Sequence, residues 1–163
     1  MAGLKCYYNS DVEFTLDTGA GWFTLLLLKA PANHPLIIDN WGVQPRGVNN
    51  ADKPLRTRLV RVTTDGAGST DKSTDIGVRN GRSETPQATI LDGGATSPHF
   101  STEPTLDSRH TVRGMTTHPQ AGQDLPSIDR GDLMVPGGGR VALQVNNEGG
   151  GSISCESELS WEE

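Results

Sequence analysis

Four histidines, His34, His99, His110 and His118, are the side chains best suited to metal binding or proton transfer. None belongs to a His-Glu-x-x-His pattern, which would place two zinc ligands on one face of a helix. Three of them lie next to a proline, where a turn or a loop edge is expected. A metal enzyme of the cupin type needs a cluster of metal-binding histidines, and the spacing of His99, His110 and His118 does not supply it. The sequence therefore predicts surface or turn histidines and no metal site.

The acidic and glycine-rich stretches also lack the spacing of a chemical site. Asp65, Asp71 and Asp75 share a glycine-rich segment, but a calcium loop alternates its ligands and ends in a bidentate glutamate. The three glycines at 137–139 precede a predicted strand, whereas a phosphate-binding loop continues into Lys-Ser/Thr and a helix. No Gly-x-Ser-x-Gly motif of an α/β-hydrolase occurs, and no glycosidase carboxylate pair can be chosen. We expect no catalytic residues, no cofactor and no small-molecule substrate.

Composition limits the protein class before any element is placed. The chain has 163 residues, of which 20 are glycine and 10 are proline. This length fits one domain, 1–163, and the abundance of turn formers argues against a helical bundle. The net charge is −6, so the clustered basic residues that bind nucleic-acid phosphates are not expected. Neither a membrane-spanning apolar run nor a secretory signal is recognisable, so we expect no membrane partner.

The two cysteines, Cys6 and Cys155, lie near opposite ends of the sequence. A disulfide between them would close a very long loop and stabilise the fold through chain entropy. Without a secretory signal, two reduced thiols are the expectation and the disulfide is the alternative.

Hydrophobic periodicity predicts about eight strands and no helix. Apolar and polar residues alternate in 140–146 and in 152–162, where Ile153, Cys155, Leu159 and Trp161 share one face. Less regular patterns predict six other strands, at 11–16, 22–30, 36–43, 55–63, 88–91 and 110–117, and a shorter piece at 133–135. Such strands favour an all-β antiparallel β-sandwich of jelly-roll type with long loops. A long irregular insertion is expected around 64–107, where glycines and prolines interrupt the pattern.

Two of these strands carry side chains suited to contact with another protein. The four leucines at 25–28 are apolar on both faces, so their strand is either covered on both sides or part of a subunit contact. The strand 55–63 carries three arginines in an acidic chain, and arginine pairs bidentately with carboxylates. The alternative for the arginines is an exposed sheet face paired with the acid-rich strand 152–162. The predicted interface residues are Leu26, Leu28, Arg56, Arg58 and Arg61.

Several blocks of the sequence resemble small structural proteins from the head gene clusters of tailed phages. The first block is a strand–turn–strand at 29–43, Lys-Ala-Pro-Ala-Asn-His-Pro-Leu-Ile-Ile-Asp-Asn-Trp-Gly-Val. The other blocks follow in the expected order, at 54–61, 118–120, 135–141 and 161–163. The long segment 64–107 departs from the family's pattern, because none of it can be matched.

The resemblance implies a capsid decoration, or cement, protein. Such proteins commonly form homotrimers of β-sandwich or jelly-roll subunits, which bind the outside of a phage head and clamp neighbouring major capsid subunits. The implied location is the outer capsid surface of the virion after synthesis in the host cytoplasm, and the implied protein is not an enzyme. The alternatives are another virion jelly-roll module (head fibre, tail or baseplate), a glycan-binding module, or an enzyme on a cupin-type scaffold.

Overall fold

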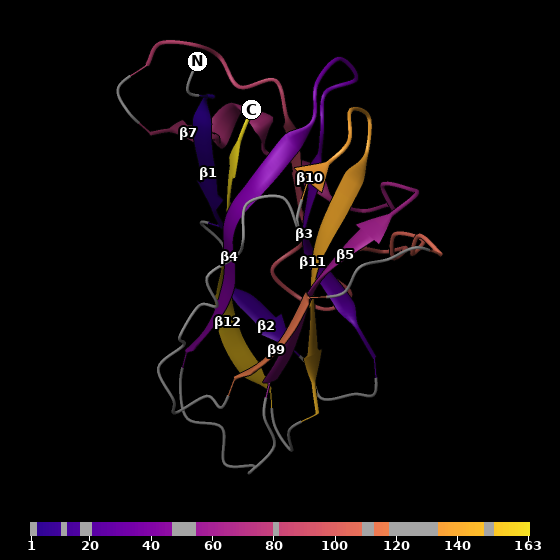
Figure 1. Cartoon of the computed structure of the whole chain (residues 1–163). Helices are drawn as coiled ribbons and strands as arrows, with labels where there is room; N and C mark the ends of the chain where they lie inside the picture. Colours follow the sequence, from indigo (N-terminus) through magenta and orange to yellow (C-terminus); the bar gives the residue numbers. More distant parts are fainter. Residues whose placement is uncertain are drawn as a thin grey trace.

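A computed structural model describes residues 3–10, 13–16, 21–46, 55–79, 82–108, 134–148 and 152–163, together with the backbone of 113–117. Two antiparallel sheets pack against each other with a hydrophobic core between them (Figure 1). The prediction of an all-β antiparallel sandwich is therefore confirmed, whereas the jelly-roll connectivity stays a prediction.

The first sheet, the β12 sheet, is built around β12 (Ile153–Glu162). Its apolar residues alternate toward the core as the sequence predicts, because Ile153, Cys155, Leu159 and Trp161 are all buried. On one side of β12 lie β4 (Leu36–Arg46) and then β10 (Met134–Val135). On the other side lie β2 (Phe14–Leu16), β1 (Lys5–Asn9) and, beyond β1, β7 (Gly77–Val78).

The second sheet, the β11 sheet, is built around β11 (Arg140–Asn147), which lies between β3 (Phe23–Lys29) and β5 (Leu55–Val62). The strands farther out are β8 (Thr89–Asp92) and β6 (Thr70–Asp71) beyond β3, and β9 (Arg113–Thr117) beyond β5. The pairing of β3 with β11 shifts register, because Leu143 lies opposite Leu26 but Gln144 lies opposite Thr24. Leu25 is therefore the extra residue of a β-bulge, and both Leu25 and Leu26 belong to the core.

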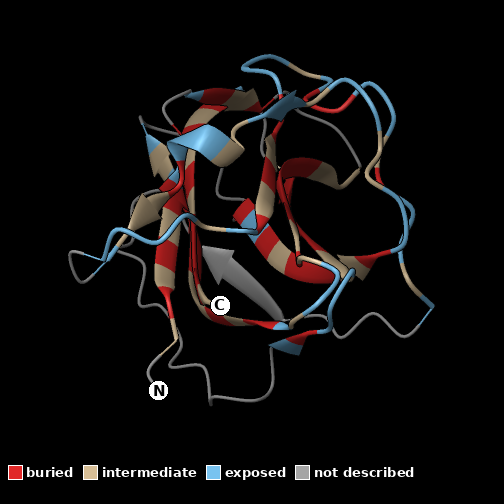
Figure 2. Ribbon diagram, turned by 90° about the horizontal axis from the view of Figure 1, so that it is seen from above, coloured by how far each residue is buried: buried red, intermediate tan, exposed pale blue. Residues whose placement is uncertain are grey.

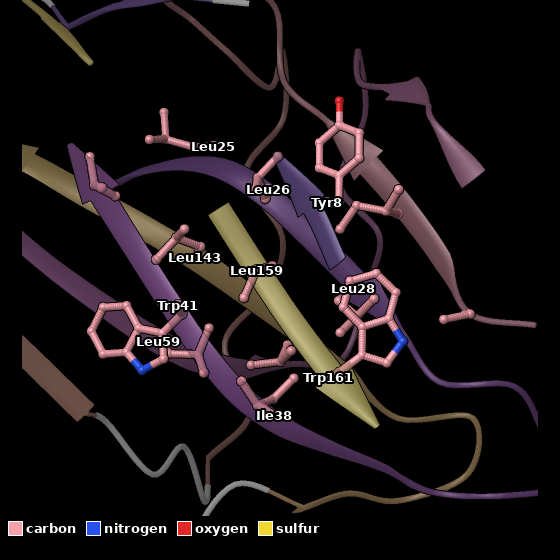
Figure 3. Packing of buried hydrophobic residues seen from close by; sticks show 14 of the residues in the cluster. Tyr8, Leu25, Leu26, Leu28, Ile38, Trp41, Leu59, Leu143, Leu159 and Trp161 are labelled. Carbon is pink, nitrogen blue, oxygen red and sulfur yellow. The ribbon is translucent and has the colours of Figure 1, made fainter. Parts of the chain in front are cut away.

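The core fills the space between the two sheets. Trp41 from β4 and Trp161 from β12 are its largest fully buried side chains. Leu28, Leu59 and Leu143 of the β11 sheet belong to the same cluster (Figure 3). Full burial of a leucine contributes roughly 1.5–3 kcal/mol relative to exposure, so this cluster is the main stabilising feature of the fold.

A smaller apolar cluster lies on the outer face of the β11 sheet. Segment 93–108 contributes Phe100, whose exposed fraction is 1%. The strands contribute Leu27, Val60, Val62 and Ala142. The four leucines of β3 are therefore central and covered on both faces, which is one of the two alternatives that their pattern allows. Figure 2 shows the resulting buried bands along the strands, with exposed residues along the connecting segments.

The structure differs from the sequence prediction in its shortest elements. Strand β1 was not predicted, because its five residues place only Cys6 and Tyr8 on the buried face, too few to show a period. The segment predicted as an irregular insertion contains the two-residue strands β6 and β7 and a single 3-10 turn, Ser73–Asp75. Predicted strand residues 11, 12 and 110–112, the block 118–120, and His110 and His118 lie outside the described residues.

Candidate functional site

Two turns meet at one end of the sandwich. The turn at 30–35 joins β3 to β4, and the turn at 136–139 joins β10 to β11. The backbone N–H of Gly138 donates to the carbonyl of Pro31 at 3.0 Å. Gly138 has a φ of +72°, which L side chains rarely adopt, and a Cβ on Gly137 would lie 2.8 Å from a backbone oxygen of the other turn. The predicted tight turn is confirmed, and its glycines allow the close approach.

A buried carboxylate, Glu163, lies at the same end. Only 5% of its side chain is exposed. Its oxygens accept hydrogen bonds from the backbone N–H groups of Gln87 at 2.8 Å and Ala88 at 3.0 Å, and from Nε1 of Trp161 at 3.2 Å. Nε2 of His34 lies 3.8 Å from Oε2 of the same carboxylate. Glu163 therefore holds three separate parts of the chain together.

A groove of about 590 Å³ opens beside Glu163. It is lined by apolar atoms of Leu4, Pro35 and Ile37, and by Arg82 and Glu84, whose charged groups lie 3.5 Å apart. His34 and Glu163 also line this groove, where the ring of His34 is partly exposed and the carboxylate of Glu163 stays buried.

The buried thiol near this carboxylate has a raised pKa. Sγ of Cys6 lies 3.9 Å from Oε1 of Glu163. Burial, and then the charge and hydrogen bond of Glu163, raise the pKa of Cys6 to about 12. The thiol therefore stays protonated near neutral pH. The role of Glu163 at this point is structural, because its hydrogen bonds hold segments of the chain together.

The three predicted interface arginines separate onto two faces of β5. Arg56 and Arg58 share the outer face of the β11 sheet with Val60, which packs in the outer cluster. Arg61 lies on the opposite face, and its Nη2 donates to the carbonyl of Met134 at 3.1 Å. The structure therefore brings only two of the three arginines together.

The predicted alternative, in which the arginines pair with the acid-rich strand, is wrong. β5 pairs with β11 and β9, whereas β12 belongs to the other sheet. Arg56 instead pairs with Glu148, just after β11, at 3.1 Å. Periodicity identifies the residues that share a face, but it does not identify the neighbouring strand.

Arg58 stacks on an aromatic residue that the sequence did not single out. Trp22 lies just before β3, and the guanidinium carbon of Arg58 is 3.9 Å from its ring centroid. Because β11 lies between β3 and β5, the two side chains meet across β11. Beneath them Nε of Arg58 donates to Oε1 of Gln144 at 2.9 Å. This arrangement, the Trp22–Arg58 arch, explains why the polar side chain of Gln144 is buried at a sheet surface.

Hydrogen bonds fix the arch to segment 93–108. Nε2 of Gln144 donates to Oγ1 of Thr24 at 3.0 Å, and this hydroxyl donates to Glu103 at 2.5 Å. The backbone N–H of Thr24 also donates to Glu103, at 3.0 Å. Because β8 pairs with β3 only at residues 26–29, Glu103 supplies the acceptor that a longer β8 would have offered. Gln144, which lies under Arg58, is therefore held in place through Thr24 and Glu103.

The charge of Arg58 is not neutralised within the described part of the chain. Its Nε has the Gln144 oxygen, a neutral acceptor, and its face has Trp22. The terminal nitrogens Nη1 and Nη2 make no hydrogen bond or ion pair with any described residue. Burial lowers the pKa of Arg58 from its usual value, but a guanidinium remains protonated at neutral pH. The arch therefore presents a partly dehydrated cation.

The two predicted interface leucines, Leu26 and Leu28, are fully buried in the core between the sheets. Their burial within a single chain accounts for their apolar character. The candidate contact surface therefore rests on the arginines, with Trp22 added.

Two aspartates of the acidic glycine-rich segment contact other side chains. Asp65 bonds to Arg140 and pairs with Lys29 at 3.4 Å, so its charge is already balanced. Asp71 accepts a hydrogen bond from the hydroxyl of Ser73 at 2.5 Å. Within the described ranges, no group of three His, Cys, Asp or Glu residues could hold a metal ion.

One histidine is placed differently from the prediction. His99 was expected at the surface or in a turn, but it is buried, and its Nδ1 lies 2.5 Å from the carbonyl oxygen of Gly94. Its ring packs edge-on against Phe14 and Phe23, at centroid distances of 5.4 and 6.4 Å. The neighbouring proline indicated a turn but not that segment 93–108 folds back over the sandwich. His34 lies in the turn at 30–35, as expected.

Cys6 and Cys155 are both buried free thiols, in agreement with the expectation of two reduced cysteines. No helix in the described ranges has the length and hydrophobicity required to cross a membrane.

Comparisons of the chain with protein-family models, curated proteins and solved structures find no match.

Proposed function

We propose that the chain is a structural virion protein, a homotrimer that binds the outside of a phage head and clamps neighbouring major capsid subunits. The proposal starts from the resemblance of its sequence blocks to phage head proteins. Its main support is that four of these blocks contribute to one end of the sandwich. Block 29–43 contains one of the touching turns and block 135–141 contains the other. Block 161–163 contributes Glu163, and block 54–61 contributes Arg61.

The convergence of these blocks supports a role in binding the capsid. Segments that are far apart in the sequence come together at one end only after folding, and together they can form one contact surface. Met134 lies at this end with an exposed fraction of 46%, the highest of any large hydrophobic side chain among the described residues. Methionine is enriched in protein interfaces, so Met134 would supply an apolar contact at this end. On a lattice, many modest contacts of this kind together stabilise the shell through multivalency.

Co-sedimentation with purified heads of the phage that encodes the chain tests the proposal. We expect saturable binding to heads, and light scattering of the free protein should give about three times the mass of one chain. Met134→Glu should weaken head binding at least tenfold, because it places a charge in an apolar contact. The matched control is Arg46→Glu, at the other end of β4 on an exposed side chain, which should bind heads normally.

Two results would contradict the proposal. One is a monomer that does not sediment with heads at any concentration. The other is saturable binding that Met134→Glu and Arg46→Glu weaken equally, which would show that the converging end is not the contact surface. Electron microscopy of labelled particles would then separate a tail or baseplate location from a head location.

A further inference from the structure

The Trp22–Arg58 arch has the features of a prepared binding site for an anion. The guanidinium plane is fixed by the indole at 3.9 Å and by the Gln144 oxygen at 2.9 Å. Gln144 is fixed in turn through Thr24 and Glu103. Little side-chain entropy remains to be lost when a ligand binds, because the cation is already oriented.

The outward edge of the guanidinium is the part that is open to a ligand in the described part of the chain. Nη1 and Nη2 have no partner among the described residues, and these two nitrogens form the fork that matches a carboxylate bidentately. The guanidinium edge therefore offers N–H donors to an acceptor that the described residues do not supply.

We propose that the Trp22–Arg58 arch binds an aspartate or glutamate carboxylate on an acidic segment of a partner protein. In the complex, Nη1 and Nη2 of Arg58 donate to the two carboxylate oxygens while Trp22 covers one face of the guanidinium. Arginine and tryptophan are the side chains most enriched among residues that dominate protein–protein binding. Partial burial strengthens the pairing, because the local dielectric is lower than in water.

A protein carboxylate fits this surface better than a nucleic-acid phosphate. Phosphate-backbone binding needs several unpaired cations in a row. On this face Arg56 is already paired with Glu148, so a single free guanidinium remains among the described side chains. One guanidinium can pair with a single carboxylate, whereas it cannot follow a run of phosphates. A short acidic segment with one well-placed carboxylate meets these conditions.

Titration with a blocked hexaglutamate peptide tests the proposal, with Trp22 as the reporter. Trp22 is the partly exposed tryptophan, whereas Trp41 and Trp161 are buried, so a ligand at the arch should change mainly the Trp22 emission. We expect a saturable change that weakens as salt rises from 50 to 200 mM. A blocked hexalysine peptide and a hexathymidine oligonucleotide should give no saturable change.

Variants locate the binding. Arg58→Lys keeps the positive charge and most of the apolar stem but loses the planar fork, so we expect binding at least fivefold weaker with little change in folding. Arg58→Gln should abolish binding, as measured by calorimetry and with circular dichroism as the check on folding. Arg46→Gln is the matched control, because Arg46 pairs with Glu156 at 2.6 Å on the other sheet, and it should bind as the original chain does.

The proposal is overturned if the unmodified protein shows no saturable response to hexaglutamate at millimolar concentration. It is also overturned if Arg58→Lys binds as tightly as the original chain, or if the oligonucleotide binds more tightly than the peptide. The inference goes beyond the proposed virion role, since the titration uses the purified chain alone. Failure of the peptide titration leaves the head-binding test unaffected, and failure of head binding leaves the arch unaffected.

Discussion

Replacement of Phe100 by alanine tests whether segment 93–108 is part of the folded core or only a surface connection. Phe100 is 1% exposed and covers Leu27, Val60, Val62 and Ala142 on the outer face of the β11 sheet. Truncation of a buried phenylalanine costs about 3–5 kcal/mol. The outer cluster is small and lies under one segment that can partly close over the cavity, so we expect the lower value, about 3 kcal/mol.

Such a loss is a large share of the roughly 5–15 kcal/mol that keeps a domain of this kind folded. Thermal unfolding should show a midpoint lowered by about 6–12 °C, since 1 kcal/mol corresponds to about 2–4 °C in a chain of this length. Leu106→Ala is the matched control in the same segment, because Leu106 is 38% exposed, and it should cost under about 1 kcal/mol. If Phe100→Ala loses no more stability than Leu106→Ala, the segment does not contribute to the core and the reasoning fails.

Three further predictions concern ionisable groups. Glu163→Gln should lower the free energy of unfolding in urea by about 1–3 kcal/mol, because an amide nitrogen cannot accept the backbone N–H bonds that the carboxylate receives; an unchanged midpoint would count against this. Burial raises the pKa of both Cys6 and Cys155 to about 12, so a thiol reagent at pH 8 should leave the native protein unmodified but label two thiols per chain in urea. Ionisation of these thiols in the unfolded chain should also make stability fall as pH rises above about 8.5, and rapid native labelling would refute their burial. Partial burial raises the pKa of Asp65, but the charges and hydrogen bonds of Arg140 and Lys29 lower it by more, so the pKa lies below its usual value. Its stabilisation, under about 1 kcal/mol at this exposure, is present above about pH 4 and lost as pH falls through the lower folded value; Asp65→Asn should remove that part of the acid dependence in urea titrations between pH 5 and pH 2.

The strands with a clear period were predictable from the sequence. The core-facing residues of β11 and β12 are those that the pattern indicates, but the other face of β11, with Ala142 and Gln144, is buried as well. β1 was missed because a five-residue strand with two inward side chains gives almost no periodic signal. The two-residue strands β6 and β7 form only because they pair with β8 and β1. The local sequence of a two-residue strand carries no information about such a partner.

The candidate site was only partly predictable. The unusual density of arginines in β5 drew attention to Arg58, but its partners come from elsewhere in the chain. Trp22 follows a glycine-rich turn and Glu103 lies in a segment without period, so their convergence depends on the order β3, β11, β5. The signal that could have found Trp22 is a large aromatic residue at the start of a strand, outside its apolar run. Leu26 and Leu28 were predicted as interface residues because a core and a subunit contact favour the same apolar residue types. In the structure both are buried within the single chain.

The position of β12 in its sheet has a consequence for synthesis on the ribosome. β12 inserts between β4 and β1, two strands that are made more than a hundred residues earlier. Until residues 153–162 have emerged, the facing edges of β1 and β4 lack the strand that pairs with both of them in the folded structure. Unpaired strand edges are the surfaces through which incomplete chains aggregate, and pairings of such high sequence separation form slowly. The nascent polypeptide should therefore depend on holding chaperones until residues 153–162 are released, and truncation before residue 153 should prevent folding to a soluble protein.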